Sequence, residues 1–163
     1  MAHIEEMVDD SLQDVRREVS MLRDESAVRC VGMSRWRRLC EVFAVSTGVR
    51  VSVKLTSDLE VVTEEISETI YRIIQESLTN AYRHGGADHV DVSGTWKRSD
   101  GLLLVRISDN GRGASEVVPG NGLSGMRERL EALNGTLAWM TRPGRGFDLG
   151  VEIPWRGVAN GQD

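Results

Sequence analysis

The chain has 163 residues, of which 40% are hydrophobic and 28% charged, and its formal net charge is -5. This size and composition predict one globular domain with a small additional element, and no apolar run is long enough to span a bilayer. Arginine outnumbers lysine by 18 to 2, but the negative net charge and the scatter of the arginines exclude nucleic acid as the expected partner. Two cysteines, Cys30 and Cys40, predict neither a disulfide framework nor a zinc site, which favours a reducing, cytoplasmic setting.

The N-terminal segment differs from the rest in charge. Residues 1–26 carry eight acids and three arginines, a net charge of -5 that equals the net charge of the whole chain. Apolar residues recur in this segment every three or four positions, as on one stripe of a helix: Ile4, Val8, Leu12, Val15, Val19 and Leu22. We expect one long helix over 1–30 whose stripe pairs with a second copy of the chain or with another helix.

Hydrophobic periodicity divides the remaining residues into helices and strands. The predicted helices are 34–47, 63–84 and 123–133. The predicted strands are 49–55, 90–96, 102–108, 136–141 and 147–153. Ser34 and Thr63 are the expected helix N-caps, and glycines follow the first two helices. The order of elements predicts an α/β (α+β) two-layer sandwich, with helices on one face of a mostly antiparallel mixed sheet, preceded by one long helix.

The first candidate site lies on the central helix. Glu76 and Asn80 are four residues apart on one helical face, and Arg83 and His84 follow about one turn later. A carboxylate and an amide oxygen are hard ligands that suit Mg²⁺, whose shell nucleotide phosphates normally complete, and an arginine suits a phosphate oxygen. Read alone, these residues also fit the solvated side of an amphipathic helix.

The second candidate follows an apolar strand and reads Asp109-Asn-Gly-Arg-Gly113. The two glycines permit a backbone turn beside a ligand, and an aspartate at a strand end can accept a hydrogen bond from an exocyclic amine such as that of adenine. An ordinary Asx turn explains the same residues equally well in isolation.

The third candidate is the glycine-rich stretch Gly120-Asn-Gly-Leu-Ser-Gly125, directly before the last predicted helix. Glycine amides at a helix N-terminus suit a phosphate, because unpaired N–H groups and the helix dipole both favour an anion. The pattern is formally G-x-G-x-x-G, but a dinucleotide-binding turn should directly follow the first strand of a βαβ unit. Here a second glycine turn and residues 114–119 intervene, which disfavours that reading.

Together, the order and spacing of the three motifs resemble the N box, G1 box and G2 box of the GHKL (Bergerat) ATP-binding fold. The resemblance is closest to sensor histidine kinases of two-component systems, in the subfamily paired with LuxR-type response regulators. The phrases that carry it are Gln75-Glu-Ser-Leu-Thr-Asn-Ala-Tyr-Arg-His84 and Gly122-Leu-Ser-Gly-Met-Arg-Glu-Arg-Leu130.

The resemblance implies a role for each motif residue. Asn80 is expected to bind Mg²⁺, Glu76 to orient the metal shell or the attacking group, and Arg83 and His84 to lie near the phosphates. Asp109 is expected to accept a hydrogen bond from the adenine amine. The glycines that the resemblance assigns to the base pocket are Gly111 and Gly113. The residues that it assigns to the hinge of a short triphosphate lid over 114–119 are Gly120 and Gly122. Leu123 is expected to be a further nucleotide-binding residue.

The resemblance also implies a domain organisation. Residues 1–30 would be the second helix of a dimerisation and phosphoacceptor hairpin, 31–156 the catalytic ATP-binding domain, and 157–163 a frayed tail. The first hairpin helix, with its phosphoacceptor histidine, is absent from the sequence, so we expect the chain not to phosphorylate itself. It is then either a fragment of a larger sensor or a stand-alone module that acts in trans. Phe147 departs from the family, which usually has Thr or Ser there, and this departure implies weaker ATP binding.

The expected function is transfer of the ATP γ-phosphoryl group, with Mg²⁺, to a histidine on a hairpin helix absent from this chain, for relay to a LuxR-type response regulator. A homodimer through the N-terminal helix is a further expectation. The expected location is the cytoplasm, either as a free protein or as the cytoplasmic part of a membrane-bound sensor. Two alternatives stay open: an anti-sigma-type serine kinase, and a non-catalytic ATP-binding or dimerisation module.

Overall fold

The computed structural model describes residues 32–117 and 120–157, which form helices packed on a five-stranded sheet. The helical elements are α2 (Met33–Thr47), the 3-10 turn η1 (Ser57–Val61), α3 (Glu64–Asn80), the π-helical turn η2 (Ala81–Gly85) and α4 (Asn121–Glu131). The strands are β1 (Arg50–Leu55), β2 (His89–Lys97), β3 (Leu102–Asp109), β4 (Thr136–Thr141) and β5 (Phe147–Pro154).

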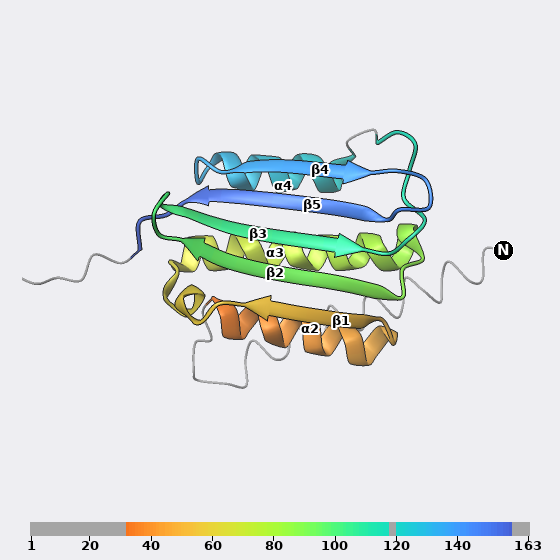
Figure 1. Cartoon of the computed structure of the whole chain (residues 1–163), viewed down its shortest axis with the longest axis horizontal. Coiled ribbons are helices and arrows are strands. Elements are labelled where there is room, and N and C mark those ends of the chain that lie inside the picture. Colours follow the sequence, from red (N-terminus) through yellow and green to blue (C-terminus); the bar gives the residue numbers. More distant parts are fainter. Residues whose placement is uncertain (1–31, 118–119, 158–163) are drawn as a thin grey trace, which may run out of the picture.

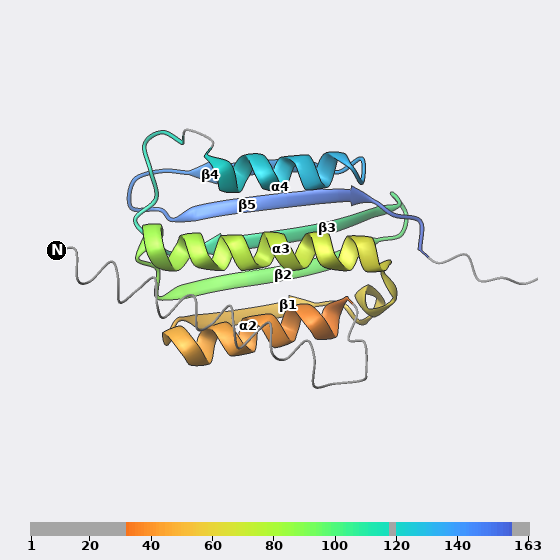
Figure 2. The same cartoon turned by 180° about the vertical axis from the view of Figure 1, so that it is seen from behind.

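The sheet has the order β1-β2-β3-β5-β4, in which β1 is parallel to β2 and all other neighbours are antiparallel. Figure 1 views the sheet from the front, and Figure 2 shows α2, α3 and α4 side by side on its other face. The prediction of a two-layer sandwich on a mostly antiparallel mixed sheet is therefore confirmed.

The core lies between the two layers. Strand residues with a period of two point toward the helices and are buried: Val90, Val92, Leu103, Val105, Ile107, Leu149, Val151 and Ile153. The central helix α3 meets them with Ile70, Ile73, Ile74 and Leu78, all fully buried. Cys40 of α2 is also buried, and this burial raises the pKa of its thiol to about 12.

Local chemistry explains where α3 begins. The hydroxyl oxygen of Thr63 accepts a hydrogen bond from the backbone N–H of Ile66 at 3.3 Å, as its predicted role of N-cap requires. Glu64 and Glu65 follow in the first turn, where negative charge is favourable beside the helix dipole.

The structure differs from the predicted elements at several points. Ser34 does not cap α2: the helix begins after Gly32, and the Ser34 N–H donates to the Glu60 carboxylate at 2.9 Å instead. The expected helix over 63–84 ends as an α-helix at Asn80 and continues as the π-helical turn η2. The turn η1 was not predicted, and α4 begins two residues before the predicted start.

The predicted N-terminal helix over 1–30 and most of the predicted tail lie outside the described residues. No helix in the described part of the chain has the length and apolar character needed to cross a membrane.

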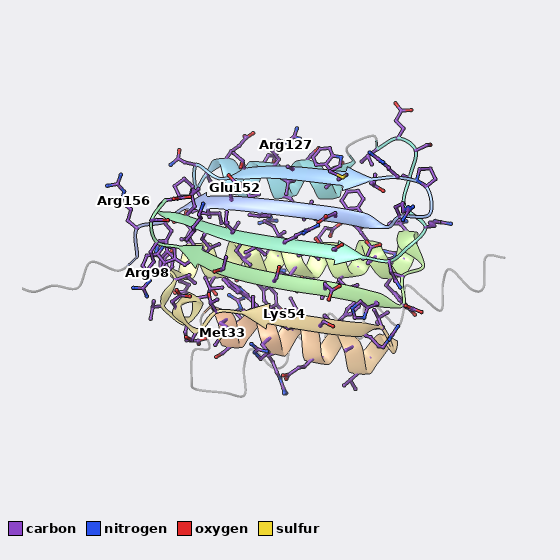
Figure 3. The ribbon with its side chains drawn as sticks, viewed as in Figure 1. Met33, Lys54, Arg98, Arg127, Glu152 and Arg156 are labelled. Atoms are coloured by element: carbon purple, nitrogen blue, oxygen red, sulfur yellow. The ribbon has the colours of Figure 1, made fainter. Side chains whose placement is uncertain are left out.

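The sheet face opposite the helices is polar. Figure 3 looks onto this face and labels Lys54 of β1 and Glu152 of β5, whose side chains are both exposed. Near the centre of the face, Arg106 pairs with Asp148 across β3 and β5. The charged outward positions and the apolar inward positions follow from the period-two alternation of each strand.

Candidate functional site

The three predicted motifs meet at one end of the sheet, although they are far apart in sequence. The C-terminal ends of α3 and β3 and the beginnings of α4 and β5 all lie at the right-hand end of the molecule in Figure 1. β4 and β5 are antiparallel, and β5 begins at this end, so the turn between them lies here as well.

Asp109 is the last residue of β3 and continues that strand's inward-facing series, so its carboxylate points toward the helix layer. Its Oδ1 accepts a hydrogen bond from the Gly111 N–H at 2.8 Å. Partial burial raises the pKa of the Asp109 carboxyl, while the N–H groups of Gly111 and Phe147 act in the opposite direction. The position therefore offers an acceptor inside a partly desolvated space, as recognition of an amine requires.

The loop after Asp109 is hydrogen-bonded to the end of the central helix. The Gly85 carbonyl, in the π-helical turn, accepts from the Arg112 N–H at 2.8 Å. The Asn110 side-chain oxygen accepts from the N–H groups of Asp88 and His89, at 3.1 and 3.0 Å. These bonds fix the loop against both α3 and the start of β2.

The same loop is also hydrogen-bonded to the β4–β5 turn. The Arg112 carbonyl accepts from the Gly144 N–H at 2.7 Å. The Thr141 hydroxyl accepts from the Ala114 N–H at 3.0 Å and donates to the Gly146 carbonyl at 2.7 Å. A single hydroxyl thus links the two loops that lie beside Asp109.

Glycine is required sterically at several points of this arrangement. A Cβ on Gly111 would lie 2.6 Å from the Gly85 carbonyl oxygen. Gly113 and Gly146 have positive φ angles of 60° and 68°, and a Cβ on either would lie within about 2 Å of a backbone oxygen. The backbone segments next to Asp109 therefore pack closely against one another.

Glu76 and Asn80 lie on the last turns of α3, on the side that faces α4. A Cβ placed on Gly122 would lie 2.5 Å from Oε1 of Glu76, so the carboxylate lies directly against the first turn of α4. The Asn80 side chain is half-buried. Glu76 and Asn80 therefore place two oxygen-bearing side chains near the C-terminal end of α3.

The third motif forms the beginning of α4. Gly120 is the N-cap residue, and its cap involves no side-chain hydrogen bond. Gly122 contacts Glu76 as described, and Leu123 is partly buried against the core. The first N–H groups of a helix have no partner within the helix, which gives this end an affinity for anions.

Arg83 and His84 lie on the π-helical turn η2, and both side chains are exposed. A π-helical turn widens the backbone locally and is often found at functional sites. The structure thus brings the N-box residues and Asp109 to one end of the fold. The lid predicted over 114–119 includes residues that lie outside the described part of the chain.

Sequence reasoning missed two residues of this region. Asn110 braces the start of β2, and Thr141 joins the two loops beside Asp109. Asn110 lies within the G1 motif, and an asparagine in a turn often accepts hydrogen bonds from backbone N–H groups, so its role could have been predicted. Thr141 carried no signal, since a threonine at a strand end is commonplace and its partners are distant in sequence.

The residues present suit a nucleoside triphosphate with Mg²⁺. The donor set of a carboxylate and an amide oxygen is hard, as Mg²⁺ prefers, and the half-buried Asp109 carboxylate suits an exocyclic amine. Within residues 32–117 and 120–157, no group of three or more His, Cys, Asp and Glu side chains is placed to hold a metal ion.

Comparison with known proteins identifies the fold's family. Residues 65–157 match the model of the family described as histidine kinase-, DNA gyrase B-, and HSP90-like ATPase. The chain belongs to this family. The matched range includes all three motifs, so the resemblance inferred from them is confirmed at the level of the family.

The relatives are sensor kinases. The chain is 34% identical over 149 residues to the sensor histidine kinase YxjM of Bacillus subtilis, covering 88% of this chain and 34% of the relative. It is 32% identical over 155 residues to the signal transduction histidine-protein kinase/phosphatase DegS of Brevibacillus brevis, covering 93% of this chain and 39% of the relative. The chain thus spans about a third of the length of these curated relatives.

A solved structure supports the same fold. The histidine kinase domain of the blue-light activated histidine kinase EL346 from Erythrobacter litoralis superposes with a TM-score of 0.65 at 22% identity. The match covers 89% of this chain and 71% of that domain. The described residues therefore form the ATPase-type domain found in sensor histidine kinases.

Proposed function

We propose that this chain binds Mg-ATP and transfers the γ-phosphoryl group to a histidine of a phosphoacceptor helix. The observation that carries the proposal is the meeting of three elements at one end of the fold: the Glu76–Asn80 turn of α3, the inward-facing Asp109, and the first turn of α4 against Glu76. The end of α3 suits the metal and the phosphates, and Asp109 suits the base. The first turn of α4 suits the phosphates as well.

Base recognition is assigned to Asp109 and its glycines. The ionised carboxylate accepts from the adenine amine, whereas guanine presents a carbonyl oxygen at that position and is repelled. Gly111 and Gly113 let the backbone turn closely beside the base, since a side chain at either would meet backbone atoms.

Phosphate binding is assigned to the end of α3 and the beginning of α4. Asn80 would hold Mg²⁺ through its amide oxygen and Glu76 would orient the metal shell or the attacking group, while Arg83 and His84 lie close to the phosphates. Mg²⁺ would neutralise charge that develops on the phosphate oxygens. Gly120 and Gly122 would allow the preceding segment to move over the triphosphate, and Leu123 would contact the nucleotide.

The transfer needs little covalent chemistry from the protein. A histidine nitrogen forms a bond to the γ-phosphorus as the bond to the β-phosphate oxygen breaks, and ADP leaves. The role of the residues named above is to align the phosphates and to neutralise their charge. Positioning and charge neutralisation account for most of the rate acceleration in enzymatic phosphoryl transfer.

The partners follow from the same proposal. Residues 1–30 would form the second helix of a dimerisation and phosphoacceptor hairpin, next to a catalytic domain over 31–156, and would pair with another helix through their apolar stripe. The histidine would be supplied by another segment of the full-length protein or by another chain. A response regulator, of the LuxR type, would then take the phosphoryl group. The reaction would occur in the cytoplasm.

Calorimetric titration of the chain with ATP, with and without Mg²⁺, tests the binding step. We expect wild type to bind ATP, Mg²⁺ to tighten binding, and Asn80→Ala and Asp109→Ala to lose it. A folded wild type that binds no ATP at millimolar concentration would contradict the proposal.

Transfer is tested separately, with [γ-³²P]ATP and a purified histidine hairpin of a related sensor kinase. Acid-labile label on the hairpin supports histidine transfer. Acid-stable label on a serine would instead indicate a serine kinase, and binding without transfer a non-catalytic module.

A further inference from the structure

Ser77 has an unusual position on the central helix. It lies one turn after Ile73 and one turn before Ala81, on the face of α3 that points toward the sheet. Ile73 is fully buried and Ala81 is 2% exposed, whereas Ser77 is partly exposed. Ser77 therefore differs from its neighbours on the same face, which are sealed against the sheet.

The hydroxyl of Ser77 has no hydrogen-bond partner among the described residues, although its oxygen is shielded from solvent. Two other hydroxyls of α3 are engaged: Ser67 accepts from the Gly32 N–H at 2.9 Å, and Thr79 donates to the Gln75 carbonyl at 2.9 Å. An unpaired buried hydroxyl is costly, and a hydrogen-bond partner from outside the described residues would remove that cost.

Ser77 lies close to the residues assigned to the base. It precedes Asn80 by one helical turn, and the Asn80 carbonyl oxygen lies 3.8 Å from the position of a Cβ on Gly85. Oδ1 of Asp109 lies 3.6 Å from that same position. The C-terminal end of α3 therefore lies close to Asp109. Ser77 lies on the sheet-facing side of α3, and Asp109 continues the helix-facing side of β3.

Two further inward-facing residues near Asp109, Thr141 and Phe147, offer no spare hydroxyl. Thr141 uses its hydroxyl between the Ala114 N–H and the Gly146 carbonyl. Phe147, the first residue of β5, has none. Asp109, when ionised, can only accept hydrogen bonds, so it serves the adenine amine but not the neighbouring ring nitrogen N1, which is itself an acceptor.

We propose that Ser77 is a specificity-determining residue for adenine, whose hydroxyl donates a hydrogen bond toward N1 while Asp109 accepts from the adjacent amine. This inference rests on the proposed function, because it assumes that the base lies beside Asp109. It adds a donor from the helix layer to the acceptor from the sheet layer, so that adenine is recognised from both sides.

The test compares ATP with 1-deaza-ATP, which keeps the amine but has a C–H in place of N1, on the 163-residue chain and three variants. We expect wild type to bind 1-deaza-ATP about fivefold more weakly than ATP, the factor that corresponds to one net hydrogen bond. Ser77→Ala should bind ATP about fivefold more weakly than wild type and should no longer distinguish the two nucleotides. Ser77→Thr, which keeps the hydroxyl, should restore the discrimination.

Ser46→Ala, on the exposed side of α2, is the matched control and should behave as wild type. Ser77→Ala should also melt at a higher temperature than wild type without nucleotide, because an unpaired hydroxyl has been removed. Equal affinity of wild type and Ser77→Ala for ATP would overturn this inference, while loss of binding in Asp109→Ala would leave the proposed function standing. Absence of ATP binding by folded wild type would overturn both.

Discussion

The glycines on the two sides of the candidate site differ in what surrounds them. Beside Asp109, a Cβ on Gly111, Gly113 or Gly146 would overlap backbone oxygen atoms. At the beginning of α4, a Cβ on Gly120 would meet nothing within 4 Å, and one on Gly122 would meet only the side chain of Glu76.

This difference separates a fixed half of the site from an adjustable half. Backbone atoms held by hydrogen bonds withdraw less readily than the end of a side chain, so the loops beside Asp109 have little room to rearrange. A glutamate side chain can rotate away at small cost. A base of constant shape suits the fixed half, whereas a triphosphate that must be enclosed and released suits the adjustable half.

Gly146→Ala should have the largest effect. Its φ of 68° is unfavourable for alanine, and a Cβ would lie 1.9 Å from the Asp109 carbonyl oxygen. We expect the free energy of unfolding to fall by about 3 kcal/mol or more. Gly144→Ala, in the same turn with φ 72° and open space, should cost only about 1 kcal/mol. Urea unfolding of both variants measures the difference, and equal losses would refute the steric argument.

Thr141→Val should have the next largest effect, since it removes the hydroxyl that joins the two loops. The Ala114 N–H and the Gly146 carbonyl each lose a partner, which should lower the free energy of unfolding by about 1 to 2 kcal/mol. ATP affinity should fall as well, because Asp109 loses its support. Thr136→Val, exposed at the other end of β4, is the control, and a similar loss there would argue against the hydroxyl link.

Asp109→Asn should stabilise the protein while abolishing ATP recognition. Burial raises the pKa of Asp109 above its ordinary value of 3.8, so the folded state binds this proton more tightly than the unfolded state. Stability from this group is therefore present at low pH and is lost as pH rises through 3.8 to the raised pKa.

At pH 7 we expect the Tm of Asp109→Asn to exceed that of wild type by roughly 2 °C, a small value because the group is half exposed. The difference should shrink as pH falls toward 3.8. Thermal unfolding followed by circular dichroism across this pH range is the measurement. A Tm difference that grows on acidification would show that folding does not raise the pKa of Asp109.

Gly122→Ala should have the smallest effect on stability, below about 0.5 kcal/mol, because Glu76 can move aside and alanine favours the helix. Displacement of Glu76 should nevertheless weaken Mg-ATP binding about tenfold. Gly125→Ala, in the same helix, should leave binding within about twofold of wild type, since the added methyl meets open space. If both variants bind ATP like wild type, the contact between Glu76 and α4 has no role in binding.

Much of the fold was predictable from local pattern. The period-two strands β2 and β3 and the apolar face of α3 were read correctly because burial imposes the same period on the sequence. The Thr63 cap was also predictable, since its partner is only three residues away. Ser34 is not the cap because α2 already begins at Met33, and the carboxylate of Glu60, distant in sequence, accepts the Ser34 N–H.

The sequence by itself determined which residue types are available for nucleotide chemistry, because the motifs of α3, the β3 end and α4 are each written in consecutive residues. Only the tertiary structure decided how they are held. The Thr141 link, the Gly146 contact and the unpaired hydroxyl of Ser77 all depend on neighbours from other elements. Periodicity reports which side of an element is buried, but it carries no information about which distant atom a buried polar group will meet.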